Sequence, residues 1–258
     1  KNVETLNVGD RITANTLVTC FDCYYCRNGQ QQICQARRLI GAHRPGAFAE
    51  YVAVPYRNVF RLEDHVSFEE GTLVEPFAFT VHTCRLLELQ PQERLLIYGA
   101  GPIGLLALQT AQIYGVRDIV VVDLNEERLE IVEELGGIAK TNIDVESERF
   151  DVAIDAVGAG ITRLNSVKAV RPGGKVAFTG LHEAESTLPI NDMIRSEIRT
   201  IGVFGYSDDD FLTAVRWIGE ERITMTPWIE NTPLSDGGRA FEKLITNPGK
   251  VAKIVLNI

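Results

Sequence analysis

A short apolar run, a tight glycine turn and a helical pattern follow one another from residue 95, and they constrain the fold more than any other part of the chain. Leu95-Leu96-Ile97-Tyr98 is bounded by turn residues, as expected for a buried strand. Gly99-Ala100-Gly101-Pro102-Ile103-Gly104 follows at once, has the spacing G-x-G-x-x-G, and opens a predicted helix over 102–114. Such a strand, turn and helix are typical of a parallel α/β sheet.

The alternation continues to about residue 204. The patterns predict strands at 119–122, 151–156, 175–178 and 200–204, and helices at 126–135 and through Val167. Strands that alternate with helices are connected by right-handed crossovers and form a sheet with helices on both faces. We therefore expect an α/β fold of the Rossmann type, with a doubly wound parallel sheet.

The glycine turn has the spacing that binds a dinucleotide. Gly99 would permit the tight turn, Gly101 would let a pyrophosphate approach the backbone, and Gly104 would let helix and strand pack closely. Asp123 follows the next predicted strand, where a carboxylate accepts hydrogen bonds from the adenosine ribose and repels a 2′-phosphate, so NAD is predicted over NADP. The alternative is a structural glycine turn with a helix-capping aspartate.

Four of the five cysteines have the spacing C-x2-C-x2-C-x7-C, at Cys20, Cys23, Cys26 and Cys34. Four thiolates form a closed tetrahedral zinc site with no position for water or substrate, so the predicted metal is structural. A pair of disulfides is the alternative, but nothing in the sequence indicates secretion. A nucleic-acid-binding zinc ribbon is disfavoured because the net charge of -9 and the pI of about 5.1 would repel phosphate.

The two ends of the chain have a different character. Residues 1–75 read as mostly β, with period-two alternation over 11–19 and 46–54, and a helical pattern begins after Glu75-Pro76. Residues 209–258 contain two helical patterns and a strand-like segment at 251–256. Because the first residue is Lys1 and 1–9 already alternates like a strand, we expect the chain to begin inside a domain.

Length and composition place the chain among globular proteins. It has 258 residues, 45% hydrophobic and 24% charged, which suffices for one large or two modest domains. No apolar run approaches the length that spans a bilayer, and no basic, apolar leader is present. These features predict a cytoplasmic protein without a membrane or nucleic-acid partner.

Together these motifs resemble the zinc-containing medium-chain alcohol and polyol dehydrogenases, the group that holds sorbitol, threonine and sugar-alcohol-phosphate dehydrogenases. The resemblance covers essentially the whole chain and rests on seven segments: Gly9-Asp10-Arg11, the four cysteines, 43–51, Val74-Glu75-Pro76, 99–104, Asp123 and Gly173-Gly174-Lys175. It implies a partial GroES-like catalytic domain over 1–76 that carries the zinc loop, an NAD-binding Rossmann domain over 77–205, and a return to the catalytic domain over 206–258. A homodimer or homotetramer is also implied.

The resemblance further implies a second, catalytic zinc with an open position. In the family its ligands come from one cysteine and a Gly-His-Glu segment before the position of Gly9, and in many members from an acidic residue at the position of Glu75. This sequence shows no counterpart of the first two, so Glu75 is the one predicted ligand, with a first-turn helix carboxylate as the alternative. His43 is the second predicted catalytic residue, in a loop expected near the cleft.

By the same resemblance, eleven residues are predicted to contact the cofactor. For Arg128 the alternative is a solvated surface charge, and for Ile103, Leu181, Val203 and Phe204 it is ordinary packing. The predicted set is Gly99, Gly101, Ile103, Gly104, Asp123, Arg128, Thr179, Gly180, Leu181, Val203 and Phe204.

The predicted activity is a zinc-dependent oxidoreductase that transfers hydride between NAD and a secondary alcohol, which is a polyol, sugar alcohol or amino alcohol. Because two catalytic-metal segments lack counterparts, these 258 residues are expected to show little alcohol oxidation. The alternative is a non-catalytic NAD(H)-binding protein with one structural zinc. A zinc-free quinone reductase is disfavoured by the four-cysteine loop and Asp123.

Overall fold

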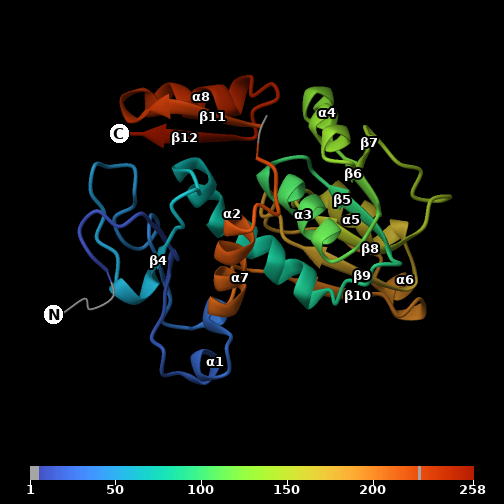
Figure 1. Cartoon of the computed structure of the whole chain (residues 1–258). Coiled ribbons are helices and arrows are strands. Elements are labelled where there is room, and N and C mark those ends of the chain that lie inside the picture. Colours follow the sequence, from blue (N-terminus) through green and yellow to red (C-terminus); the bar gives the residue numbers. More distant parts are fainter. Residues whose placement is uncertain (1–5, 226–227) are drawn as a thin grey trace.

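A six-stranded parallel sheet dominates one half of the molecule (Figure 1). The computed structural model describes residues 6–225 and 228–258. The strand order is β10-β9-β8-β5-β6-β7. This is a doubly wound order, and the doubly wound parallel sheet expected from the sequence is confirmed. The strands are β5 (Arg94–Tyr98), β6 (Asp118–Val122), β7 (Ile138–Lys140), β8 (Phe150–Asp155), β9 (Val170–Phe178) and β10 (Arg199–Gly202).

The register of the sheet aligns the carboxyl ends of its central strands. Tyr98 pairs with Val122 on one side and with Asp155 on the other, and Phe178 pairs with both Asp155 and Gly202. The segments that follow β5, β6, β8, β9 and β10 therefore leave the sheet at one edge. This is the edge at which doubly wound sheets bind ligands.

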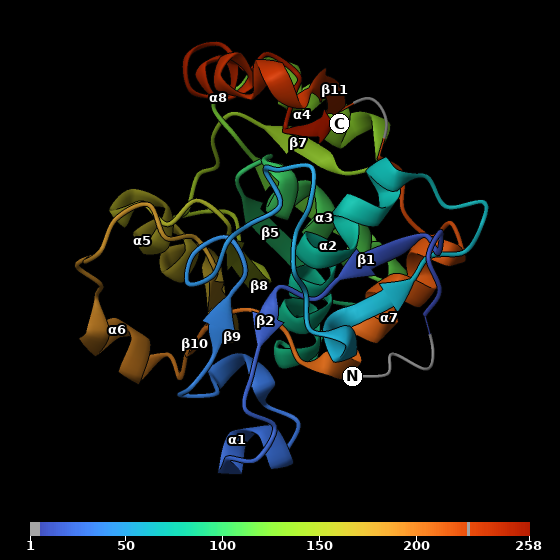
Figure 2. The same ribbon diagram turned by 90° about the vertical axis from the view of Figure 1, so that its left-hand side faces the viewer.

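Helices cover both faces of the sheet because its strands are apolar on both sides. Leu95 and Ile97 belong to a core cluster with α2 and α3, whereas Leu96 and Tyr98 belong to a second cluster on the opposite face. Figure 2 shows α5 and α6 on the left of the sheet and α2 and α3 on its right. The helices are α2 (Phe68–Leu86), α3 (Pro102–Ile113), α4 (Glu126–Glu134), α5 (Gly160–Ala169) and α6 (Ile190–Arg195).

The remaining elements form the other half of the molecule (Figure 1). Three two-stranded sheets pair β1 with β4, β2 with β3, and β11 with β12. The strands are β1 (Ile12–Ala14), β2 (Leu17–Val18), β3 (Arg38–Leu39), β4 (Val59–Arg61), β11 (Ile229–Pro233) and β12 (Lys253–Asn257). The helices are α1 (Tyr24–Arg27), α7 (Asp208–Gly219) and α8 (Gly237–Thr246), with single 3-10 turns at Gln31–Ile33, Tyr56–Asn58 and Leu234–Asp236.

Helix α2 begins earlier than the sequence pattern predicts. Ser67 caps the helix: its side chain accepts a hydrogen bond from the backbone N–H of Glu70, whose carboxylate accepts from the backbone N–H of Ser67. Pro76 consequently lies inside the helix instead of at its start. Glu75 is thus a mid-helix residue, and its interpretation as a first-turn carboxylate is wrong. The predicted domain boundary at 76–77 falls within this continuous helix.

Two predicted strands before α2 differ from the structure. Residues 11–19 form two short strands, and 46–54 form none, with Phe48 and Tyr51 largely exposed. A strand needs a neighbour for its backbone N–H and C=O groups, and no described segment pairs with 46–54. Residues 1–5 of the predicted strand at 1–9 lie outside the described residues, and 6–9 are not in a strand. No helix of the described residues is long and apolar enough to cross a membrane.

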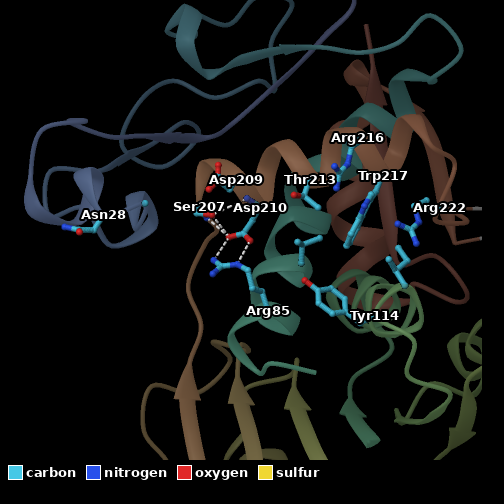
Figure 3. Close-up of a pocket in the computed structure, with 13 residues that line it drawn as sticks. Asn28, Arg85, Tyr114, Ser207, Asp209, Asp210, Thr213, Arg216, Trp217 and Arg222 are labelled. Carbon is cyan, nitrogen blue, oxygen red and sulfur yellow. Dashed lines mark hydrogen bonds and ion pairs between the residues drawn. The ribbon is translucent and has the colours of Figure 1, made fainter. Parts of the chain in front are cut away.

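A buried charge network joins α2 to α7 (Figure 3). His82 and Asp210 are each 2% exposed, and His82 Nδ1 lies 2.7 Å from Asp210 Oδ2. Arg85 Nε donates to Asp210 Oδ1 at 2.8 Å, and Ser207 N donates to Oδ2 at 2.9 Å. Burial would raise the pKa of Asp210, but the bonds from His82, Arg85 and Ser207 outweigh it and hold that pKa well below its ordinary value.

Replacing Asp210 with asparagine tests this network. Because its pKa is lowered on folding, the carboxylate stabilises the fold fully above its unfolded-state pKa of about 3.9, and this contribution is lost as the pH falls further. We expect Asp210→Asn to lower the free energy of unfolding by about 3 kcal/mol near neutral pH. Denaturant unfolding should show this difference shrinking in acid. The exposed neighbour variant Asp209→Asn is the control, and a pH-independent difference for Asp210→Asn would contradict the assignment.

Candidate functional site

The glycine turn between β5 and α3 lies at the carboxyl edge of the sheet. Gly99 has a φ of 99°, which favours glycine. A Cβ atom on Gly104 would lie 1.7 Å from the Gly99 carbonyl oxygen, so only glycine fits there. A Cβ on Gly101 would meet nothing within 4 Å, and its φ of -77° suits any residue. The fold therefore requires Gly99 and Gly104, whereas Gly101 leaves a space beside the backbone.

The beginning of α3 offers free backbone donors. Gly101 is the N-cap residue and provides no side-chain cap, and Pro102 occupies the first turn. Amides of a first helical turn, such as those of Ile103 and Gly104, have no acceptor within the helix. Together with the positive end of the helix dipole, they form an arrangement that binds phosphate.

Asp123 is fixed against the glycine turn. Its Oδ2 accepts a hydrogen bond from Ala100 N at 2.6 Å, and its Oδ1 accepts from Asn125 N at 2.8 Å. Each carboxylate oxygen keeps a second lone pair, and the side chain is half-buried, so it can still accept from a hydroxyl. The cap of α4 is Asn125, whose side chain accepts from Arg128 N, so the alternative of a capping aspartate is wrong.

Arg128 points to the C-terminal part of the chain. Its Nη2 donates to Val251 O at 3.0 Å, and Asn125 Nδ2 donates to Gly249 O at 3.1 Å. The side chain is thus half-buried and is not the solvated surface charge considered as the alternative. Its predicted contact with adenosine stays a prediction.

The segments after β9 and β10 also lie at the carboxyl edge. Thr179 and Gly180 both donate backbone hydrogen bonds to Asp155 O, and Leu181 is exposed. Val203 N donates to Phe178 O, and the Val203 side chain is buried in the core, as its packing alternative predicts. Phe204 is partly exposed under the guanidinium of Arg37.

Glu75 belongs to a polar group that the sequence motifs do not reveal. Burial raises the pKa of Glu75, while a hydrogen bond from Tyr206 and the charge of Lys253 oppose that rise. The Tyr206 hydroxyl also lies 3.1 Å from Thr16 Oγ1. Burial lowers the pKa of Lys253, against the attraction of Glu75. Glu75 lies in α2, Tyr206 follows β10, Lys253 lies in β12 and Thr16 follows β1. Because these elements are far apart in the chain, no local sequence pattern could have indicated the group.

His43 is not part of that polar group. It lies on an exposed turn, where its Nδ1 accepts a hydrogen bond from Leu39 N at 3.1 Å. Among the described residues, the only group of three or more potential metal ligands is that of the four cysteines. Glu75 therefore does not complete a catalytic metal site with the residues described.

The four predicted cysteine ligands converge. Their Sγ atoms all lie within 4.8 Å of one another, with Cys20 3.6 Å from Cys34 and 3.9 Å from Cys26. A tetrahedron with Zn–S bonds of about 2.3 Å has sulfur atoms about 3.8 Å apart, so the four thiols fit one zinc ion. All five cysteines are free thiols, which contradicts the alternative of two disulfides.

The thiols of this zinc loop differ in acidity. Backbone hydrogen bonds from Asp22 and Cys23 lower the pKa of Cys20 to about 6, whereas burial raises the pKa of Cys26 to about 12. A bound cation favours the thiolate form of every ligand. Of these two thiols, Cys26 therefore depends more on a bound metal for its ionisation.

A separate cavity of about 600 Å³ lies between the zinc loop and α2, α3 and α7 (Figure 3). Its arginines are already paired: Arg85 with Asp210, and both Arg216 and Arg222 with Glu220. None of its lining residues belongs to the glycine turn at 99–104, to Asp123, or to 179–181 and 203–204. Backbone donors of α3 and the open space beside Gly101 coincide at the carboxyl edge of the sheet instead.

Comparison with known proteins agrees with this architecture. The family model described as zinc-binding dehydrogenase matches residues 102–220, and that described as alcohol dehydrogenase GroES-like domain matches 1–64. An L-idonate 5-dehydrogenase from Vitis vinifera is 32% identical over 275 residues, covering 99% of this chain and 75% of that protein. An L-threonine 3-dehydrogenase from Yersinia pestis is 28% identical, covering 100% and 78%.

Among solved structures, L-idonate 5-dehydrogenase from Escherichia coli superimposes with a TM-score of 0.90 at 25% identity, covering 98% of this chain and 77% of that one. The fold, the glycine turn and the cysteine cluster already define a dinucleotide-binding protein with a structural metal loop. The chain belongs to the zinc-containing medium-chain alcohol and polyol dehydrogenase family. The cofactors of that class are NAD(P) and zinc.

Replacing Cys26 with serine tests the metal loop. A serine hydroxyl is a poor substitute for a buried thiolate ligand, so we expect the zinc content to fall from about one ion per chain to almost none and the melting temperature to drop. Metal analysis after dialysis and calorimetry measure both. The buried cysteine variant Cys84→Ala is the matched control and should keep its zinc. An unchanged zinc content in Cys26→Ser would contradict the assignment.

Proposed function

We propose that this protein is an NAD(H)-dependent oxidoreductase that interconverts a secondary alcohol and its ketone. Gly101 and the first turn of α3 would hold the pyrophosphate, and Asp123 would accept hydrogen bonds from the adenosine ribose. The segments 179–181 and 203–204 would line the nicotinamide end. When bound, NAD supplies the hydride acceptor. The observation that carries the proposal is the open space at Gly101 beside the anchored carboxylate of Asp123.

The names of two relatives support a proposal for the substrate class. L-idonate 5-dehydrogenase and L-threonine 3-dehydrogenase carry the names of substrates with a secondary hydroxyl at the numbered carbon. We therefore propose a polyol, sugar alcohol or amino alcohol. Glu75 and His43 are the proposed catalytic residues, and Glu75 is supported by its place beside Tyr206, close after the carboxyl end of β10.

The experiment for this function has two stages. Fluorescence titration with NADH tests cofactor binding, and NADH formation with a panel of secondary alcohols tests the reaction. Failure to bind NADH would overturn the whole proposal. Because these 258 residues are expected to show little turnover, the zinc content is measured as well: one zinc ion per chain with NADH binding but no turnover would favour the alternative of a non-catalytic NAD(H)-binding protein.

Gly101→Ala separates a phosphate site from a structural turn. Because a Cβ there meets no atom of the protein and φ is favourable, we expect the melting temperature to stay unchanged. The added methyl group would occupy the approach of the pyrophosphate, so NADH affinity should fall by about tenfold or more. Titration and calorimetry on the same samples measure the two effects. An equal affinity would rule out the assigned phosphate position.

Asp123→Ser tests the cofactor preference. Removing the carboxylate removes a ribose acceptor and the repulsion of a 2′-phosphate, so NADH should bind about tenfold more weakly and NADPH relatively better. Competition titrations give the ratio of the two dissociation constants. Asp118→Ser, at the other end of β6, is the matched control and should leave that ratio unchanged. The idea fails if Asp123→Ser retains the native preference.

A further inference from the structure

The loop after β9 has little internal structure to hold it in place. Residues 179–189 contain no helix or strand, and 181–187 are all exposed. The loop nevertheless begins with Thr179-Gly180-Leu181, which the proposed function places at the nicotinamide end. A loop that orients a cofactor needs contacts that fix its backbone. Those contacts come from the neighbouring loop after β8 and from α5.

Arg163 of α5 makes three of these contacts. Its Nη2 donates to Gly180 O at 3.1 Å and to Glu183 O at 2.9 Å, and its Nη1 donates to Ser186 Oγ at 2.7 Å. The side chain is only 13% exposed. A planar guanidinium presents several donors in a fixed geometry, so one side chain fixes the loop at three points.

Asp155 connects Arg163 to the sheet. This last residue of β8 is fully buried, and its Oδ1 accepts from Val157 N at 3.1 Å and Gly158 N at 3.0 Å. Arg163 Nε lies 3.8 Å from its Oδ2. The Asp155 carbonyl oxygen accepts hydrogen bonds from the backbone N–H and the hydroxyl of Thr179. A single residue thus binds the loop after β8, the loop after β9 and the guanidinium.

The two loops touch backbone to backbone. A Cβ on Gly158 would lie 2.2 Å from the carbonyl carbon of Gly180, and a Cβ on Gly180 would lie 2.1 Å from the carbonyl carbon of Val157, so neither position has room for a side chain. Glu183 N also donates to Gly158 O at 2.9 Å. Val157 also lies against the glycine turn at 99–104, since a Cβ on Gly99 would be 3.0 Å from Val157 Cγ2. The loop after β9 is therefore held at a defined distance from that turn.

We propose that Arg163 is a positioning residue for the nicotinamide end of the bound dinucleotide. Oriented by Asp155, it holds Gly180 and Glu183 so that the loop after β9 keeps one conformation beside the proposed cofactor position. This inference rests on the proposed function, because it assumes that NAD(H) binds at the carboxyl edge. It predicts that Arg163 matters for one end of the cofactor only.

The adenosine end depends on other elements. The pyrophosphate and ribose positions are formed by Gly101, the first turn of α3 and Asp123, and Arg163 makes no hydrogen bond or ion pair to these elements among the described residues. ADP-ribose contains the adenosine and pyrophosphate but lacks the nicotinamide. Its affinity should therefore not depend on Arg163, whereas that of NADH should.

The experiment compares both ligands by calorimetric titration in Arg163→Met and Arg163→Lys. We expect Arg163→Met to weaken NADH by about tenfold and ADP-ribose by less than about twofold. Lysine keeps the positive charge near Asp155 but presents a single ammonium, so Arg163→Lys should fold and show an intermediate loss for NADH. If Arg163→Met does not fold, the lysine variant decides the outcome.

Arg149→Met is the matched control. Arg149 also donates to two backbone carbonyls, those of Val145 and Glu148, but it precedes β8 at the opposite end of the strand. Its removal should leave both affinities unchanged. Native affinity for NADH in both Arg163 variants would overturn the inference, and so would an equal loss for NADH and ADP-ribose. If the native protein binds neither ligand, the proposed function itself fails.

Discussion

The parallel register of the six-stranded sheet is the constraint on which the rest of the structure depends. Because β5, β6, β8, β9 and β10 end level with one another, five loops that are far apart in the chain leave the sheet at one edge. Backbone hydrogen bonds between neighbouring strands hold them in this alignment. These loops provide the turn with open space at Gly101, the carboxylate of Asp123, and the two hydrogen-bonded segments that begin at Ala156 and Thr179.

Two buried aspartates stabilise this arrangement in similar ways. Asp155 ends β8 and binds two loops and an arginine, while Asp210 lies in the first turn of α7 and binds a histidine, an arginine and a capping serine. A buried carboxylate without such partners would be strongly destabilising. The hydrogen-bond partners of each aspartate offset the free-energy cost of burying its charge. Each aspartate therefore holds those partners in place. Asp155 holds the loops at the carboxyl edge of the sheet, and Asp210 attaches the sheet half to the half with the zinc loop.

The zinc loop is linked to this junction as well. Gln32, two residues before Cys34, lies with its amide 3.3 Å from His82 Nε2, and its Cβ lies against Gly205. Gly205 directly precedes Tyr206, which contacts Glu75. The zinc loop therefore supports the segment that carries Tyr206 beside Glu75, a proposed catalytic residue. A zinc ion held by four thiolates would have no open coordination position for chemistry.

The sequence by itself determined the elements whose signals are local. Alternating apolar runs specified the sheet between 95 and 204, with β7 as the one strand it did not predict, and cysteine spacing specified a four-thiol cluster that the structure brings together. Local patterns were misleading where contacts with other segments determine the structure. Residues 46–54 alternate like a strand but form none, because no described segment pairs with them. Helix α2 begins at its capping box, which places Pro76 inside the helix and not at its start. Only the tertiary structure could bring Glu75 to Tyr206 and Lys253, or Arg163 to Gly180, because those contacts join elements far apart in the chain. Periodicity and spacing report which face of an element is buried, but they carry no information about which distant side chain will be met there.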